Sequence, residues 1–173
     1  NAVARIGKLE EREILFEAMA GIGDHRVFTV EKRRKDKTTG KFNKVEFNYS
    51  ISEYAYDICS KVRNRQNNII RKALPKIEES IVDDAGIVIA FSPEGIEPGL
   101  SGLIANKIVG KYDKPALLLN ENEDTYTGSG RGHEKTLTDF RKWCEDSGLV
   151  EFAQGHDNAF GICIEKDKID EFK

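Results

Sequence analysis

The sequence predicts an α/β protein with a mixed, partly parallel sheet flanked by helices, preceded by a helical connector that carries an inserted β-hairpin. Two observations favour this fold class. From about residue 84 onward, short apolar runs rich in β-branched residues alternate with helical patterns, which implies at least one parallel pair of strands. Before that point the chain is more polar, and its patterns are those of two helices around a hairpin. We therefore divide the chain into a connector at 1–83 and a domain at 84–173.

The connector contains two predicted helices. Apolar residues recur at helical spacing over residues 9–19, and Gly21 follows as a stop signal. A longer helix is predicted at about 52–79, with Ser52 as its N-cap and an apolar stripe along one side. Pro75 is expected to kink or interrupt this helix, because proline cannot donate the helical hydrogen bond.

A β-hairpin is predicted at about 26–50, because alternating patterns flank the turn signal Thr38–Gly40. Between residues 32 and 44 a single Asp36 stands against seven cations: Lys32, Arg33, Arg34, Lys35, Lys37, Lys41 and Lys44. These charges could form an ordinary solvated face, or contact a nucleic-acid backbone that relieves their mutual repulsion. The aromatic residues Phe42, Phe47 and Tyr49 could stack on bases or form the buried face of the hairpin.

The second region predicts alternating strands and helices. Strands are expected at 86–91, 116–119, 125–130 and 160–164, and helices at 102–112, 136–147 and 167–172. The strand at 125–130 is expected to end in a glycine-rich turn.

Several classes of site and location are disfavoured by composition. The three cysteines, Cys59, Cys144 and Cys163, have no C-x-x-C spacing, so neither a zinc site nor a disulfide framework is predicted. A reduced, cytoplasmic compartment fits this pattern. No apolar run is long enough for a membrane span, and we expect no membrane partner. The three histidines lack metal-ligand spacing and no catalytic motif is recognisable, so no catalytic residue and no metal ligand is predicted in this chain.

Two strings carry the candidate site. In the first, Ser129, Gly130, Arg131, Gly132 and His133 combine close-approach glycines with a guanidinium, which suits an oxyanion such as phosphate. An ordinary flexible turn would explain the same string.

The second string contains Gly155, His156 and Asn158 just before the last predicted strand. Here a histidine could donate a hydrogen bond to phosphate or to a metal-bound water. A surface histidine in a tight turn is the other explanation.

Three motifs occur together in the order of a known domain. Residues 100–116 (LSGLIANKIVGKYDKPA), the G-S-G-R string at 128–131 and the string at 155–161 (GHDNAFG) resemble the DHHA1 domain of DHH-superfamily phosphoesterases. The opening NAVAR, from Asn1 to Arg5, resembles the N-A-x-x-R motif that follows the DHH catalytic domain in RecJ-type members. The long connecting helix is also RecJ-like. The hairpin has no counterpart in this resemblance, and with the short, divergent chain it suggests a phage-type relative.

The resemblance implies a function. RecJ-like enzymes degrade single-stranded DNA from 5′ to 3′, with manganese or magnesium held by the DHH domain. That domain would precede Asn1 and would be a partner of this segment. The segment alone is expected to bind no cofactor and to be inactive. By this resemblance, Arg131 and His156 would contact the phosphates of the substrate, and Arg5 would reach the same cleft between the two domains.

Other functions remain compatible with a DHHA1 domain. It also occurs in alanyl-tRNA synthetases, where it binds tRNA, and in phosphodiesterases that cleave short oligonucleotides or cyclic dinucleotides. The chain could also be a pure nucleic-acid clamp. Finally, the basic hairpin could dock a protein partner such as the acidic tail of a single-strand-binding protein.

Overall fold

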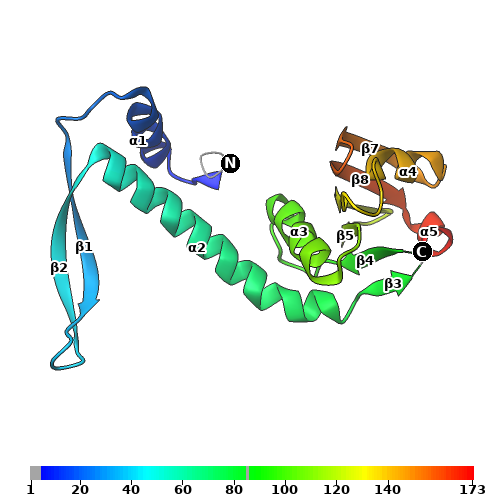
Figure 1. The fold of residues 1–173 in the computed structure, drawn as a ribbon, viewed down its shortest axis with the longest axis horizontal. Helices are drawn as coiled ribbons and strands as arrows, with labels where there is room; N and C mark the ends of the chain where they lie inside the picture. Colours follow the sequence, from blue (N-terminus) through cyan, green and yellow to red (C-terminus); the bar gives the residue numbers. More distant parts are fainter. Residues whose placement is uncertain (1–4, 85) are drawn as a thin grey trace. The chain divides into compact units, whose positions relative to one another are not determined.

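The computed structural model describes residues 5–84 and 86–173, and its chain divides into two compact units, Asn1–Asn67 and Asn68–Lys173 (Figure 1). The predicted motif residue Asn1 lies outside the described residues. Each unit has its own core, and the helix α2 (Ile51–Glu78) contributes residues to both. None of the helices in the described ranges is long and apolar enough to cross a lipid bilayer.

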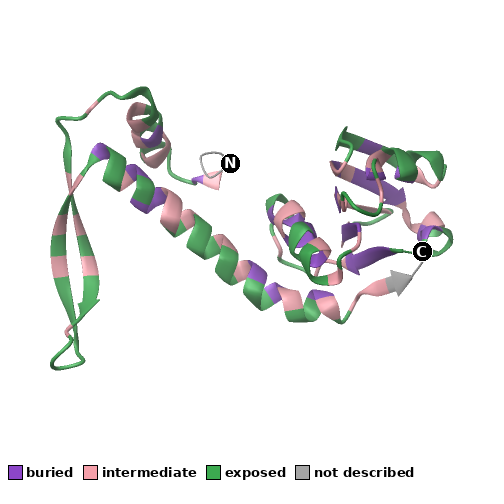
Figure 2. Ribbon diagram, in the orientation of Figure 1, coloured by how far each residue is buried: buried purple, intermediate pink, exposed green. Residues whose placement is uncertain are grey.

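The first unit consists of helix α1 (Leu9–Ala20), the hairpin β1 (Val27–Lys35) and β2 (Phe42–Ser50), and the beginning of α2. Its core is small: Ile6 and Leu15 pack with Ala55 and Ile58 of α2. The hairpin strands pair antiparallel from Val27 opposite Ser50 to Lys35 opposite Phe42, which confirms the predicted hairpin. No residue of the hairpin is fully buried (Figure 2).

The start of α2 corrects one prediction. The N-cap is Ser50, not Ser52, because the helix begins at Ile51 and the Ser50 hydroxyl accepts a hydrogen bond from the Glu53 amide at 3.4 Å. The Glu53 carboxylate in turn accepts the Ser50 amide at 2.8 Å. This reciprocal pair is a capping box, and it fixes the point where the hairpin passes into the helix.

The end of α2 corrects another. The helix runs through Pro75 to Glu78, so Pro75 does not interrupt it, and the alternative of a kink at Pro75 stays a prediction. Packing compensates for the hydrogen bond that proline cannot make, because Ile70, Ala73 and Ile77 are buried in the core of the second unit. The compact units therefore divide within α2, whereas the proposed division of connector and domain near residue 83 stays a prediction.

The second unit is built on a six-stranded mixed sheet in the order β3-β4-β5-β6-β8-β7. Its strands are β3 (Val82–Asp84), β4 (Ile87–Phe91), β5 (Ala116–Glu121), β6 (Thr125–Arg131), β7 (Val150–His156) and β8 (Ala159–Glu165). The pair β4–β5 is parallel and every other neighbouring pair is antiparallel, so the predicted mixed, partly parallel sheet is confirmed. The edge strands β3 and β7 were not predicted.

Helices cover the two faces of this sheet differently. On one face, α3 (Ser101–Tyr112) and the end of α2 bury alternate residues of β4 and β5, such as Val88 and Leu118. On the other face, α4 (Phe140–Asp146) and α5 (Ile169–Phe172) pack over Leu117, Phe160 and Ile162. Short 3-10 turns, Pro98–Leu100 and Lys166–Lys168, lead into α3 and α5. Helices thus flank the sheet as the sequence predicts (Figure 1).

Two further predictions are wrong in detail. The strand predicted at 125–130 is confirmed as β6, but the G-S-G-R string is not a turn, because Gly128–Arg131 lie inside β6 and pair with β5 and β8 on either side. The helix predicted from residue 136 begins at Phe140, because the Asp139 side chain caps it by accepting the Lys142 amide at 2.8 Å.

Candidate functional site

Strand register brings the two candidate strings to one end of the sheet. Arg131 of β6 is opposite Ala159 of β8, and Ala159 is opposite His156 of β7. Paired residues of neighbouring strands point to the same face, so Arg131 and His156 share a face two strand spacings apart, roughly 10 Å. His156 is exposed and Arg131 is half-buried. Ser129 lies on the same face, two residues before Arg131.

The guanidinium of Arg131 is the strongest anion-binding candidate. It lies against the first turn of α3, where a Cβ added to Gly102 would be 2.2 Å from Nη2 of Arg131. Its Nη1 donates to the carbonyl of Gly130 at 2.6 Å, and within the described residues it forms no ion pair with a carboxylate. Burial lowers its pKa, although an arginine in a protein keeps its charge. A half-buried cation without a counter-ion favours an anionic ligand.

The beginning of α3 adds positive potential beside this cation, because helix amino termini carry a partial positive charge. Ser101, the first residue of α3, is buried and accepts a hydrogen bond from Nδ2 of Asn120 at 3.2 Å. Asn120 also donates to the carbonyl of Thr127 at 3.1 Å, which ties the helix to β6.

A shallow pocket of about 240 Å³ opens on the same face, lined by Ser101, Thr127, Ser129, Phe152 and Gly161 among others. A Cβ at Gly161 would meet nothing closer than 3.8 Å, so the lack of a side chain there leaves the pocket open rather than relieving a clash. Sequence reasoning missed this use of Ser101, Thr127 and Phe152. Of the residues that line this pocket, Gly161 had a sequence signal, because it ends the GHDNAFG string at 155–161.

Other predicted residues have structural roles here. Asn158 forms the β7–β8 turn with Asp157, and its side chain donates to the carbonyl of Thr138 at 3.1 Å. Its own carbonyl accepts the amide of Gly132 at 3.0 Å. Gly155 has a φ of 138°, a conformation that L side chains rarely adopt. These residues hold the end of the sheet in shape.

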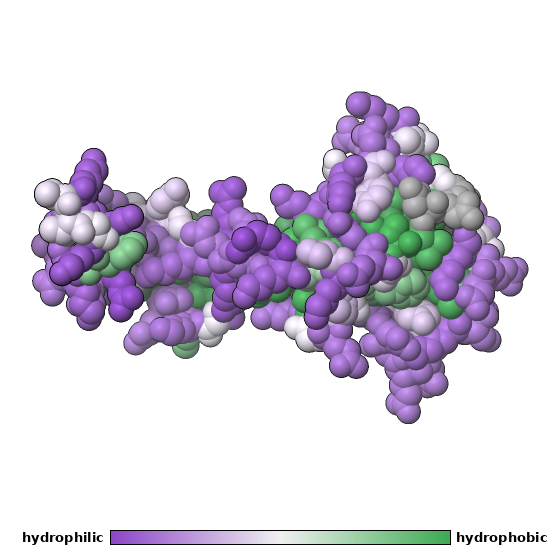
Figure 3. All heavy atoms as spheres, turned by 90° about the horizontal axis from the view of Figure 1, so that it is seen from below, coloured by the Kyte–Doolittle hydropathy of each residue, from purple (hydrophilic) through white to green (hydrophobic). Residues whose placement is uncertain are grey.

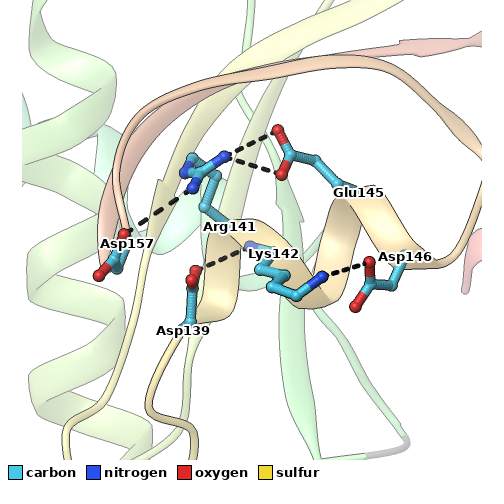
Figure 4. Close-up of polar contacts among 6 residues, drawn as sticks. All are labelled: Asp139, Arg141, Lys142, Glu145, Asp146 and Asp157. Carbon is cyan, nitrogen blue, oxygen red and sulfur yellow. Dashed lines mark hydrogen bonds and ion pairs between the residues drawn. The ribbon is translucent and has the colours of Figure 1, made fainter.

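The β7–β8 turn is also fastened to α4 (Figure 4). The carbonyl of Asp157 accepts the Arg141 amide at 2.9 Å, and the Asp157 carboxylate is 3.8 Å from the Arg141 guanidinium. Arg141 is held in place by Glu145 at 2.7 Å. Unlike Arg131, this arginine is therefore already neutralised by carboxylates.

His133, another candidate, lies just beyond β6 and has intramolecular partners. Its Nε2 is 3.0 Å from a carboxylate oxygen of Asp113, and its Nδ1 is 3.4 Å from the Thr136 hydroxyl. These contacts join the loop after β6 to the end of α3.

Two groups of predicted site residues belong to the first unit. Arg5 is half-buried within the first unit, and its predicted approach to the cleft stays a prediction. In the hairpin, Lys32 pairs with Asp57 of α2. The other predicted backbone contacts, Arg33, Arg34, Lys35, Lys37 and Lys41, are all exposed.

Neither a metal-ligand cluster nor a reactive thiol accompanies these residues in the described part of the chain. Within residues 5–84 and 86–173, no group of three or more His, Cys, Asp or Glu side chains is arranged to hold a metal ion. Burial raises the pKa of the Cys144 thiol to about 12, which makes it an inert core residue. The arrangement is thus one that can bind and position an anion.

Comparison with known proteins identifies the relatives of the chain. No protein-family model matches it. It is 29% identical over 178 positions to a protein named SPbeta prophage-derived single-strand DNA-specific exonuclease YorK of Bacillus subtilis, and equally to its counterpart in Bacillus phage SPbeta. The match covers 98% of this chain and 29% of each relative.

Two more distant similarities were found. The single-stranded-DNA-specific exonuclease RecJ of Bacillus subtilis is 24% identical over 136 positions, which cover 74% of this chain and 16% of RecJ. A solved structure, described as a DHH domain of a member of the s1p family of ribosomal proteins, aligns with a TM-score of 0.44 and 23% identity. That alignment covers 70% of this chain and 31% of the other.

The chain is therefore RecJ-like, as the motifs predicted. Its similarity to a prophage and a phage protein confirms the predicted phage-type relationship. It spans less than a third of the length of those relatives.

Proposed function

We propose that residues 68–173 bind the phosphates of single-stranded DNA as the substrate-binding part of a metal-dependent 5′ to 3′ exonuclease. The observation that carries the proposal is the half-buried Arg131 guanidinium, which has no carboxylate partner within the described residues and lies beside the start of α3. The names of the relatives, single-strand DNA-specific exonucleases, support the choice of ligand.

The geometry gives each group a task. Arg131 offers a planar pair of donors to one phosphate, and the first turn of α3 adds a favourable dipole. The open pocket floor at Gly161 and the hydroxyl of Ser129 lie along the same face, and the exposed His156 stands further along it. A DNA strand bound to these groups would be held in one position. Such positioning aids hydrolysis by a catalytic centre in another domain of the enzyme.

The chemistry itself is assigned to a partner. Manganese or magnesium would be held by a DHH catalytic domain, as in the RecJ-like enzymes that the motifs resemble. A cytoplasmic location, with a single-strand-binding protein as a further partner, completes the proposal.

The test is a change of Arg131 to glutamine. Fluorescence anisotropy of a labelled ~20-nucleotide single strand should give a Kd about tenfold weaker or more, because a charge-assisted hydrogen bond contributes about 1.5–3 kcal/mol. The dependence of log K on log salt should become shallower by about one.

Lys135→Gln is the matched control, since Lys135 is an exposed cation four residues away in the sequence. It should weaken binding less than threefold. Equal losses in the two variants would mean that the protein attracts DNA by overall charge, and the assignment of Arg131 would be withdrawn.

A further inference from the structure

The distal half of the β1–β2 hairpin, residues 32–44 on either side of the turn, carries many cations that no carboxylate of the described residues neutralises. Five of its cations are exposed and form no ion pair within the described part of the chain: Arg33, Arg34, Lys35, Lys37 and Lys41. The remaining two are engaged, Lys32 with Asp57 and Lys44 with Glu31 at 2.7 Å.

The single acid of this half does not offset the charge, because Asp36 is used to build the turn. One carboxylate oxygen accepts the amides of Thr38 and Thr39, each at 2.8 Å. These backbone hydrogen bonds, that from Thr39 first, lower the pKa of Asp36 and keep it ionised. The turn is thus held in a defined shape while the cations around it stay free.

The free cations lie on both faces of the ribbon. Successive residues of a strand point to opposite faces, so Arg33 and Lys35 share one face and Arg34 lies on the other. Lys37 and Lys41 flank the turn between the strands. A strand of nucleic acid lying on one face would leave the cations of the other face unused. A ligand with phosphates on both sides would use all of it.

The aromatic residues of the hairpin are mostly at its other end. Phe28 stacks on Tyr54 of α2 at 4.5 Å, and Phe47 and Tyr49 are half-buried neighbours 6.3 Å apart. In the distal half only Phe42 is exposed, at 66%. Hydrophilic residues dominate the surface at the hairpin end in Figure 3. The distal half therefore lacks the row of exposed rings on which single-stranded bases stack.

We infer that the distal half of the hairpin binds in the major groove of double-stranded DNA. Paired strands lie about 4.8 Å apart, and the major groove is about 12 Å wide and 8.5 Å deep, which admits a two-stranded ribbon. Cations on both faces then meet the phosphates of both groove walls. This surface is separate from Arg131.

The test compares three labelled ligands of the same sequence and ~20 positions: a DNA duplex, an RNA duplex and a DNA single strand. The triple variant Arg33→Gln, Arg34→Gln, Lys37→Gln removes charge from both faces and the turn. Lys72→Gln, Lys76→Gln, Lys107→Gln removes the same charge from exposed positions of α2 and α3. Circular dichroism checks that both variants remain folded.

The hairpin variant should bind the DNA duplex at least tenfold more weakly at about 100 mM salt, with the salt slope reduced by about 2–3. The control should lose less than threefold. The unchanged protein should bind the RNA duplex several-fold more weakly than the DNA duplex, because the major groove of A-form RNA is too narrow for a ribbon.

Three results would overturn the inference: equal affinity for the two duplexes, equal losses in the two triple variants, or a hairpin loss confined to the single strand. Tighter binding of an acidic peptide than of the duplex would assign the hairpin to a protein partner instead. The effect of Arg131→Gln on single-strand binding tests the proposed function of Arg131 and does not affect the inference about the hairpin.

Discussion

Replacing Gly128 with alanine is expected to destabilise the second unit by about 3 kcal/mol or more. Gly128 lies in β6 between two neighbouring strands, and a Cβ there would be 2.0 Å from the carbonyl oxygen of Leu118. The obstacle is backbone of the adjacent strand, so no side-chain rotation can relieve it. Chemical denaturation followed by circular dichroism measures the change, which corresponds to a fall in melting temperature of about 12 °C or more.

Gly161→Ala is the matched comparison for this experiment. It adds the same methyl group to the neighbouring strand β8, where nothing lies closer than 3.8 Å. Its free energy of unfolding should change by less than about 1 kcal/mol. If both alanines were tolerated equally, the pairing of β5 with β6 described here would be wrong at this position.

Asp57→Asn is expected to destabilise the first unit by about 2 kcal/mol. Asp57 is 7% exposed and pairs with Lys32 of the hairpin and with Lys61 at 2.8 Å. Removing one partner of a buried ion pair costs about 3–5 kcal/mol, and we reduce this figure because the lysine side chains are 38% and 62% exposed. Amide hydrogen exchange of β1 and β2 should accelerate. The control is Glu46→Gln, which changes an exposed acid of the same hairpin and should leave the exchange rates of β1 and β2 unchanged.

Acidification should have a related effect on the first unit. Burial alone would raise the pKa of Asp57, but hydrogen bonds from Lys32 and Lys61 outweigh it and the pKa lies below its ordinary value. A backbone hydrogen bond from Ser50 likewise lowers the pKa of Glu53 in the capping box. A lowered pKa in the folded state contributes stability above the unfolded value, about 3.9 for Asp and 4.3 for Glu, and this is lost as pH falls further.

The amide resonances of the hairpin, followed by NMR from pH 6 to pH 3, provide the measurement. They should begin to lose dispersion below about pH 4, and Asp57→Asn should weaken this dependence. A hairpin equally ordered at pH 3 and pH 6 would contradict the role given to these carboxylates.

Most of the fold could be predicted from local patterns. The apolar run at Ile87–Phe91 predicts a strand, and the apolar stripe of α3 predicts a helix, each from a few neighbouring residues. β7 could not be found this way, because only Ala153 among its residues is buried and the strand therefore lacks a strong apolar alternation. Ser50 and Ser52 are equally good caps in sequence, and only the position of Glu53 three residues after Ser50 distinguishes them.

The sequence suggests residues for the candidate site but not their arrangement, and the assignment of those residues stays a prediction. The strings around Arg131 and His156 are far apart in sequence, and nothing local states that Ala159 lies between them. That Arg131 lies against Gly102 depends on how α3 crosses the sheet, which is a tertiary property. The hydrogen bonds of Asn158 were likewise hidden, because an asparagine before a strand reads equally well as a ligand or as a turn residue.

The alternation within β6 changes what its motif can reveal about descent. Gly128 and Gly130 face crowded atoms of the fold, the second close to the ring of Phe160, while Ser129 and Arg131 lie on the opposite face of the sheet and are half-buried there. Selection for folding alone would preserve the two glycines, whatever the chain binds. The crowding that excludes a side chain at these two glycines does not act on Ser129 and Arg131, which lie on the other face. Among relatives we therefore expect the two glycines to follow only the need to form the sheet, and Ser129 and Arg131 to change if the ligand changes.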